Sequence, residues 1–149
     1  VLPILELARS YYVRSDEDSN GKWRLTFHAE NVGIGPARVL DFRVTVDGKA
    51  YPTWPAALEA LVGGDVEIFG GQSTINGRTI PAERLVTMFD LDTAEVAPQI
   101  VAGMNDGRLN FEACYCSVFD ECWKTDYQTD LGAARPVRRC ERDGDSFTQ

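Results

Sequence analysis

The stretch WRLTFHAENVGIGPARVLDFRVTVDG, residues 23–48, decides the fold class. Apolar and polar residues alternate through residues 23–30 and again through residues 40–47, as in strands that bury one face and expose the other. The side chains expected to point inward are Trp23, Leu25, Phe27 and Ala29, then Leu40, Phe42, Val44 and Val46. The second segment ends at Asp47-Gly48, a dipeptide that favours a tight hairpin turn. We therefore expect two half-buried strands joined by a shaped corner.

Two further segments continue this alternation, residues 85–91 and residues 109–116. In the first segment, one face is expected to carry Leu85, Thr87, Phe89 and Leu91, and the other face Val86, Met88 and Asp90. In the second segment, the inward side chains are expected to be Leu109, Phe111, Ala113 and Tyr115. Turn-forming residues separate the strands, at residues 15–21, at Asn76-Gly77 and at residues 105–107.

Two short helices are expected between the strands. One covers residues 54–62 and is entered through Thr53 and Pro55. The other covers residues 94–103, and Pro98 within it favours a start near that proline. Several short strands with minor helices predict a mainly β protein, specifically an antiparallel immunoglobulin-like β-sandwich with one or two short helices. A closed β-barrel is the alternative fold.

The composition of the 149 residues limits the classes of partner. With 15 Lys and Arg against 23 Asp and Glu, the net charge is −8, so the chain lacks the basic surface that nucleic acid requires. His28 is the only histidine, which excludes sites that need two imidazoles. The length suits a single domain, residues 1–149, and no run of about 18 apolar residues could span a membrane. The chain begins at Val1, so we expect a processed or shortened form of a longer protein.

The cysteines at 114, 116, 122 and 140 are the sharpest chemical signal, and they allow three pairings. A bond between Cys114 and Cys116 is disfavoured because residues i and i+2 of a strand lie about 6.5–7 Å apart with parallel side chains. If a hairpin turns over residues 117–121, Cys116 faces Cys122. We therefore favour the disulfides Cys116–Cys122 and Cys114–Cys140. Zinc held by four thiolates and free or redox-active thiols are the alternatives, although the C-x-x-C spacing typical of zinc sites is absent.

The acidic stretch at residues 16–21 is a candidate calcium site. Asp16, Asp18 and Asn20 supply oxygens at alternate positions, as in the first half of a calcium-binding loop. The twelfth position of such a loop, which needs a bidentate carboxylate, is Phe27. We therefore favour a simple acidic turn over a calcium site.

The segment N-x-G-x-G-P-A at residues 31–37 predicts a corner between two strands. Gly33 and Gly35 permit positive φ, and Pro36 fixes its own φ. Asn31 can hydrogen-bond to the local backbone. A phosphate-binding glycine loop would need a helix to follow, whereas a strand follows here. These residues are therefore assigned a structural role.

Residues that suit catalysis have ordinary structural explanations. His28 is the only possible imidazole base, and the alternation places it on a solvated strand face. A hydrolase would have to use carboxylate pairs such as Asp90 with Asp92 or Asp120 with Glu121. The sequence gives no distance within either pair, so it offers no support for an enzyme.

Two groups of residues suit binding. The basic group fits an acidic partner or anionic lipid headgroups as well as a solvated strand, and it comprises Arg135, Arg138, Arg139 and Arg142. The aromatic group fits a sugar or peptide site as well as a sandwich core, and it comprises Tyr11, Tyr12, Tyr51, Trp54 and Trp123.

The segments ENVGIGPARVLDFRVTVDGKAYPTW, residues 30–54, and YCSVFDECW, residues 115–123, carry a family resemblance. They resemble a group of uncharacterised bacterial proteins with an N-x-G-x-G-P-A segment, a strand ending in V-D-G-K, a short helix containing Trp, and a Y-C-S-V-x-x-x-x-W hairpin. The matching residues are Asn31, Gly33, Gly35, Pro36, Ala37, Asp47, Gly48, Lys49, Trp54, Tyr115, Cys116, Ser117, Val118 and Trp123. The resemblance implies one N-terminal transmembrane helix followed by a single soluble domain, and it brings no catalytic residues. The other cysteines lie outside the family pattern.

Together these observations predict a non-enzymatic binding or interaction module. We expect it to be the extracytoplasmic part, periplasmic or at the cell surface, of a bacterial membrane-anchored protein. Its expected partner is a protein or small ligand, without a cofactor, and membrane contact is expected only through a tether. The alternatives are a hydrolase or ligand-binding enzyme domain that uses surface carboxylates, and a zinc-stabilised cytoplasmic domain. Polar groups with perturbed pKa values in one apolar pocket would favour the enzyme, whereas a flat or edge-strand surface would favour the module.

Overall fold

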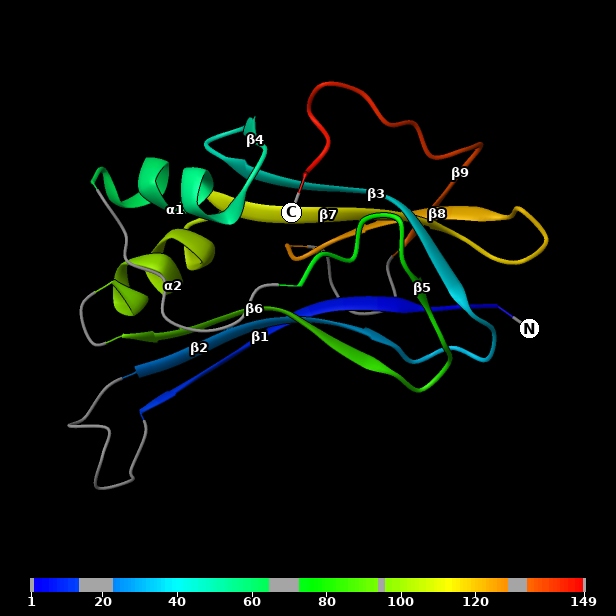
Figure 1. Cartoon of the computed structure of the whole chain (residues 1–149), viewed down its shortest axis with the longest axis horizontal. Coiled ribbons are helices and arrows are strands. Elements are labelled where there is room, and N and C mark those ends of the chain that lie inside the picture. Colours follow the sequence, from blue (N-terminus) through cyan, green and yellow to red (C-terminus); the bar gives the residue numbers. More distant parts are fainter. Residues whose placement is uncertain (1, 14–22, 65–72, 94–95, 129–133, 149) are drawn as a thin grey trace.

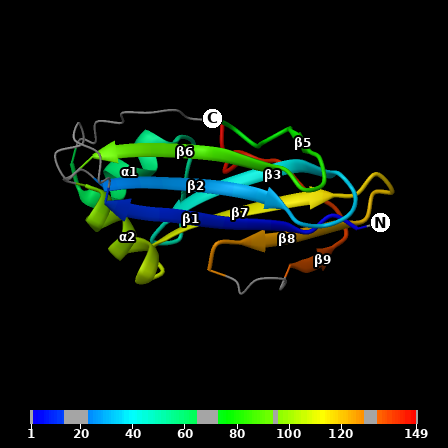
Figure 2. The ribbon, with the colours of Figure 1, turned by 90° about the horizontal axis from the view of Figure 1, so that it is seen from below.

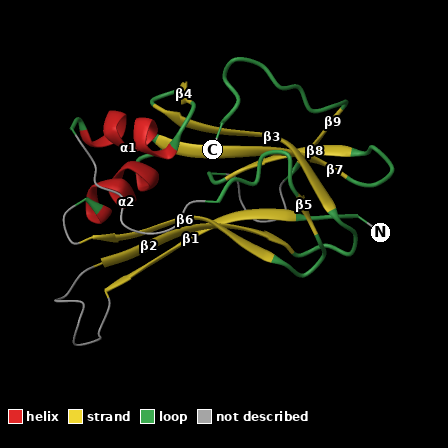
Figure 3. Cartoon of the chain, in the orientation of Figure 1, coloured by secondary structure: helices red, strands yellow, loops and turns green. Residues whose placement is uncertain are grey.

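The computed structural model describes residues 2–13, 23–64, 73–93, 96–128 and 134–148, and these form a β-sandwich. Two antiparallel sheets face each other as separate layers, and the helices of the described residues cover one end (Figure 1, Figure 3). The mainly β, antiparallel sandwich expected from the sequence is therefore confirmed. The immunoglobulin-like subtype stays a prediction.

The first sheet has the strand order β1-β2-β6, and its strands are β1 (Leu5–Val13), β2 (Trp23–Asn31) and β6 (Leu85–Thr93). The second sheet has the order β4-β3-β7-β8-β9, with β5 also beside β3. Its strands are β3 (Ala37–Val46), β4 (Lys49–Tyr51), β5 (Thr79–Ile80), β7 (Leu109–Cys116), β8 (Cys122–Asp126) and β9 (Arg135–Val137). Figure 2 shows the long strands of the two layers running in similar directions, as in aligned sandwiches.

Aromatic rings fill the space between the sheets. Phe27 of β2 and Phe89 of β6 come from the first sheet, and Phe42 of β3 and Phe111 of β7 come from the second. Trp54 lies among them, with its ring centroid 5.1–6.2 Å from theirs. All five side chains are buried. Burial of one such side chain contributes roughly 1.5–3 kcal/mol, so this cluster is a main source of the free energy of folding.

A β-bulge in the first sheet corrects the alternation predicted for residues 85–91. Phe27 is paired with Phe89, but the next residue, His28, is paired with Thr87, so Met88 is left unpaired. A bulge inserts one extra residue, and the parity of the side chains therefore differs on its two sides. Leu85 and Thr87, expected on the same face as Phe89, are exposed, whereas Met88 is buried.

A second bulge, in β3, corrects one predicted core residue. The register of β3 with β7 shifts between Val39 and Asp41. Val39 and Asp41 are buried, and Leu40, predicted to point inward, is only half-buried. Beyond the shift the predicted pattern holds, because Phe42, Val44 and Val46 are all buried.

The two helices begin and end close to the predicted residues. α1 (Trp54–Val62) is capped by Thr53, whose Oγ1 accepts a hydrogen bond from a first-turn amide at 3.2 Å, and it ends at Gly63 with φ 78°. α2 (Ala97–Asn105) begins directly before Pro98, as the proline favoured, and ends at Asn105 rather than at residue 103. Both helices lie at the same end of the sandwich (Figure 1).

The C-terminal strap, residues 138–148, crosses the outer side of the second sheet and ends in the core (Figure 1). Phe147 is fully buried, with its ring centroid 5.3 Å from that of Phe42 and 5.4 Å from that of Trp54. Its amide donates to the carbonyl of Phe42 at 2.7 Å, between the parts of β3 that pair with β4 and β5. The strap therefore completes both the edge of β3 and the aromatic core.

Replacement of Phe147 by Ala is expected to destabilise the fold by about 3–5 kcal/mol, because loss of the ring leaves a cavity beside Phe42 and Trp54. Denaturant unfolding followed by tryptophan fluorescence measures this change. Phe119→Ala removes the same ring from a side chain that is 72% exposed, and it serves as the matched control. The control should change the stability by less than about 0.5 kcal/mol, and equal losses in the two variants would contradict the strap's place in the core.

Candidate functional site

Asn31 fastens the corner between β2 and β3. Its buried Nδ2 donates to the carbonyls of Gly35 at 2.9 Å and Ile80 at 3.0 Å. Its Oδ1 accepts from the amides of Gly33 at 3.1 Å and Ile4 at 3.3 Å. A side-chain amide has two donor hydrogens and two acceptor positions, so these contacts use its full capacity within the fold. The arrangement joins the N-terminal segment, the corner and β5, and Pro36 then leads directly into β3.

Gly33 is needed for a different reason from the one the sequence indicated. Neither Gly33 nor Gly35 has a positive φ; the described glycines that do are Gly48, Gly63, Gly77 and Gly107. A Cβ on Gly33 would instead lie 2.4 Å from the backbone nitrogen of Ile4 and 2.4 Å from the backbone oxygen of Leu2. The N-terminal segment thus packs directly on the backbone of the corner.

Gly33→Ala is expected to destabilise the protein by about 1–3 kcal/mol, because the crowded atoms belong to the backbone and cannot rotate away. Gly64→Ala is the matched control, since a Cβ there has nothing within 4 Å. Thermal unfolding of both variants measures the difference. A Gly33→Ala protein as stable as the control would show that the two segments do not pack this closely.

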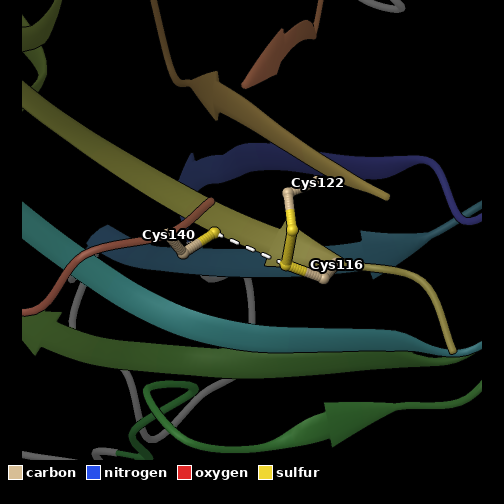
Figure 4. A group of neighbouring side chains, drawn as sticks. All are labelled: Cys116, Cys122 and Cys140. Carbon is tan, nitrogen blue, oxygen red and sulfur yellow. Dashed lines mark hydrogen bonds between the residues drawn. A yellow bond between two sulfur atoms is a disulfide. The ribbon is translucent and has the colours of Figure 1, made fainter. Parts of the chain in front are cut away.

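The four cysteines form two disulfides on the outer face of the second sheet. Cys116 of β7 and Cys122 of β8 lie opposite each other and are bonded (Figure 4). Cys114 of β7 is bonded to Cys140 of the strap. These are the two bonds favoured from the sequence, and the turn between β7 and β8 occupies the expected residues 117–121. Cys114 and Cys116 are buried although they face away from the core, because the strap covers them.

The buried carboxylate of Asp41 anchors the far end of the strap. Its Oδ1 accepts from the hydroxyl of Ser146 at 2.6 Å, and its Oδ2 accepts from Nε of Arg43 at 2.7 Å. Arg43 also lies 3.2 Å from the carboxylate of Asp143. The amide of Asp145, and then the guanidinium of Arg43, hold the pKa of Asp143 below its usual value.

A cavity of about 280 Å³ lies between the strap and the sheet. Its charged lining consists of Arg43, Lys124 and Arg139 with Glu112, Glu141 and Asp143. These groups pair with one another, as Arg139 does with Glu141 at 2.9 Å and Lys124 with Glu112 at 3.7 Å. The charges balance within the lining, and Arg43 of β3 joins the sheet to the strap through its pair with Asp143.

His28 lies half-buried on the outer face of β2, as the alternation predicted. Burial lowers the pKa of His28 below its ordinary value of 6.5, and the nearby carboxylate of Glu30 partly opposes this. A lowered pKa means that the unfolded chain binds the proton more readily. The contribution of His28 to the stability of the fold is therefore present above pH 6.5 and is lost as the pH falls below that value.

The titration of His28 can be followed alone, because the chain has one histidine. We expect the imidazole resonances in NMR spectra to titrate with a midpoint below 6.5. Glu30→Gln should lower the midpoint further, because it removes the charge that favours the imidazolium. A midpoint above 6.5, or an upward shift in the variant, would contradict the assigned environment.

Two of the four carboxylates considered for hydrolysis are engaged in ion pairs with arginines. Asp90 of β6 lies 2.5 Å from Arg24 of β2. Asp120, in the turn after β7, pairs with Arg38 of β3, and Glu121 beside it is exposed. The side chain of Asp92 lies outside the described residues.

The basic group is spread along β9 and the strap. Arg135 lies 3.4 Å from Glu112, and Arg139 pairs with Glu141 as described above. Arg138 and Arg142 are exposed. Acidic residues are thus interspersed among these arginines, which favours the solvated interpretation over an anionic ligand.

The aromatic group divides between the core and the second sheet. Trp54 is in the core, and Trp123 stacks on Tyr115 with 5.7 Å between ring centroids. Tyr51 is half-buried, with the ammonium of Lys49 5.4 Å from its ring centroid. The remaining candidates lie outside the described side chains, and they are Tyr11 and Tyr12 of the aromatic group and Asp16, Asp18 and Asn20 of the calcium site.

Sequence reasoning missed an exposed apolar surface, which we call the apolar end. Among the described residues it contains Leu2, Ile4, Val32, Ile34, Leu85, Val118 and Phe119. Ile34 is 77% exposed, and its amide donates to the carbonyl of Leu2 at 3.0 Å, so the N-terminal segment lies beside the corner. Figure 1 and Figure 2 both place the N-terminus, the corner and the turn after β7 at the end opposite the helices.

The alternation of inward and outward residues in β2 could have predicted this surface. Glu30 lies on the outer face of β2, and the same alternation continued past Asn31 places Val32 and Ile34 on that face. These two apolar residues were overlooked in the sequence because the glycines and proline around them predicted only a turn.

No family model, no curated protein and no solved structure matches the chain. Within the described ranges, no helix has the length and apolar character needed to cross a membrane.

Proposed function

We propose that this chain is a non-enzymatic interaction domain that binds a partner protein through its apolar end. The observation that carries the proposal is that the segments bearing the exposed large apolar side chains, in the part of the chain described, lie at one end of the sandwich (Figure 1). Large apolar side chains that are exposed together on a soluble domain commonly mark an interaction site. They are held on rigid supports, because hydrogen bonds to Asn31 and the Cys116–Cys122 disulfide fix the segments that carry them.

Acidic residues flank the apolar end and define the chemistry of the partner. Glu6 and Glu30 are paired neighbours on the first sheet, and they lie two residues along the chain from Ile4 and Val32 respectively. Glu83 and Glu121 are exposed in the adjoining turns beside the exposed Arg84, and Asp120 there is paired with Arg38. A surface with an apolar centre and a basic rim would complement this arrangement. The acidic rim would repel a second copy of the same surface and would also oppose anionic lipid.

We also propose that the domain works outside the cytoplasm. Two disulfides that leave no free cysteine support an oxidising compartment. The family resemblance supports a tether in front of the domain. Because Leu2 is hydrogen-bonded into the apolar end, such a tether would leave from that end and keep the partner-binding surface near the membrane.

Site-specific photocrosslinking in intact cells tests the partner surface. A photoreactive amino acid at position 34 or 119 should give one discrete adduct with another protein. The same group at Glu59 or Gln99, exposed on the helices at the other end, is the matched control and should give none. Ile34→Asp should abolish the adduct formed from position 119, because it places a charge in the apolar centre of the contact.

The mass of the adduct distinguishes the possible occupants. An adduct between two copies of this chain would assign the surface to self-association, and an adduct with lipid would assign it to the membrane. Either result would overturn the proposed protein partner, as would equal crosslinking from both ends of the sandwich.

A further inference from the structure

The sulfur atoms of the two disulfides form one continuous cluster. Sγ of Cys116 lies 3.8 Å from Sγ of Cys140, as the dashed line in Figure 4 shows. Both atoms are already bonded to other sulfurs and carry no hydrogen, so this is a contact between two disulfides. The Sγ atoms of Cys116, Cys122 and Cys140 all lie within 4.8 Å of one another, and Cys114 is bonded to Cys140.

This spacing matches a tetrahedral zinc site. Zinc binds thiolates at about 2.3 Å, so neighbouring sulfurs in a four-thiolate site are about 3.8 Å apart. Cys116 and Cys140 already have that separation. The backbone is equally suitable, because Cys122 lies opposite Cys116 and the Cα atoms of Cys114 and Cys140 are 5.6 Å apart. Once the bonds are reduced, each pair of sulfurs needs only to separate to the tetrahedral distance.

The cluster is largely buried on the outer face of the second sheet. Cys114, Cys116 and Cys122 are all buried. Arg38 of β3 is the cross-strand partner of Cys116, and Lys124 of β8 is the partner of Cys114. Both cations are ion-paired, Arg38 with Asp120 and Lys124 with Glu112, so the charges next to the cluster are balanced.

We infer that the reduced protein binds one zinc ion through Cys114, Cys116, Cys122 and Cys140. Each disulfide takes two electrons and two protons from one molecule of a dithiol, which itself closes to a cyclic disulfide. The four thiols then release their protons as zinc binds. The strap is thus fastened to β7 in both redox states, by disulfides when oxidised and by zinc when reduced. Zinc binding rests on the sulfur positions and does not require a partner at the apolar end.

Cobalt provides the spectroscopic test, because tetrahedral Co²⁺ with sulfur ligands has visible ligand-field bands and a sulfur-to-metal charge-transfer band. The protein is reduced with a phosphine, freed of reductant without air, and titrated with Co²⁺ and then Zn²⁺. We expect a tetrathiolate spectrum at one Co²⁺ per chain, displaced by an equal amount of Zn²⁺. The oxidised protein should give no such spectrum.

Variants identify the ligands. Cys140→Ser should weaken metal affinity by roughly a hundredfold or more, beyond the loss expected for an outer-shell partner. Glu112→Gln and Asp143→Asn are matched controls from the neighbouring cavity, and both should bind as the parent does. Parent affinity in Cys140→Ser would overturn the assignment of Cys140 as a ligand, and loss of binding in the two controls would move the site to the neighbouring cavity and overturn the four-cysteine site.

The fold of the reduced chain gives a second readout. Near-ultraviolet circular dichroism should show native packing after reduction in the presence of zinc. If reduction alone unfolds the chain, added zinc should restore that spectrum. A reduced chain that stays folded without taking up metal, or one that zinc fails to refold, would refute the inference.

Discussion

The contact of Trp54 with five surrounding aromatic rings is the interaction on which the rest of the structure depends. These rings come from both sheets and from the strap, and they belong to Phe27, Phe42, Phe89, Phe111 and Phe147. The two sheets share no strand within the described ranges, so packed side chains set the distance between them. Nε1 of Trp54 makes no hydrogen bond to any described residue, which leaves shape as the determinant of its position.

Residue alternation predicted the central strands because each has one face against this aromatic core. The bulges at Met88 and in β3 were not predictable, since an extra residue depends on the register of the partner strand. The strand β1 was not predicted, because the charged residue Arg9 occupies the next inward position after Leu5 and Leu7 and so interrupts the apolar alternation. In the structure, the guanidinium of Arg9 lies at the C-terminal end of α2, where one of its nitrogens donates a hydrogen bond to Oδ1 of Asn105 at 2.8 Å.

How far each candidate site could be predicted depended on whether its residues lie close together in the sequence. Strand geometry alone disfavoured a bond between Cys114 and Cys116, and a hairpin accounted for Cys116 with Cys122. The path of the strap depends on contacts between distant residues, such as Ser146 with Asp41, for which local patterns carry no signal. The apolar end depends on the face that Ile34 occupies after β2 has ended. The alternation of β2 indicates that face only when it is continued into a segment whose glycines and proline predict a turn.

The position of Phe147 also sets the order in which the domain can be completed. A chain still being synthesised can assemble both sheets before residue 147 emerges, but the middle of β3 then keeps an open edge and Phe42 lacks one aromatic neighbour. Open strand edges readily pair with other chains. The nascent domain is therefore most exposed to aggregation in the interval before residue 147 emerges, and docking of the strap closes that interval.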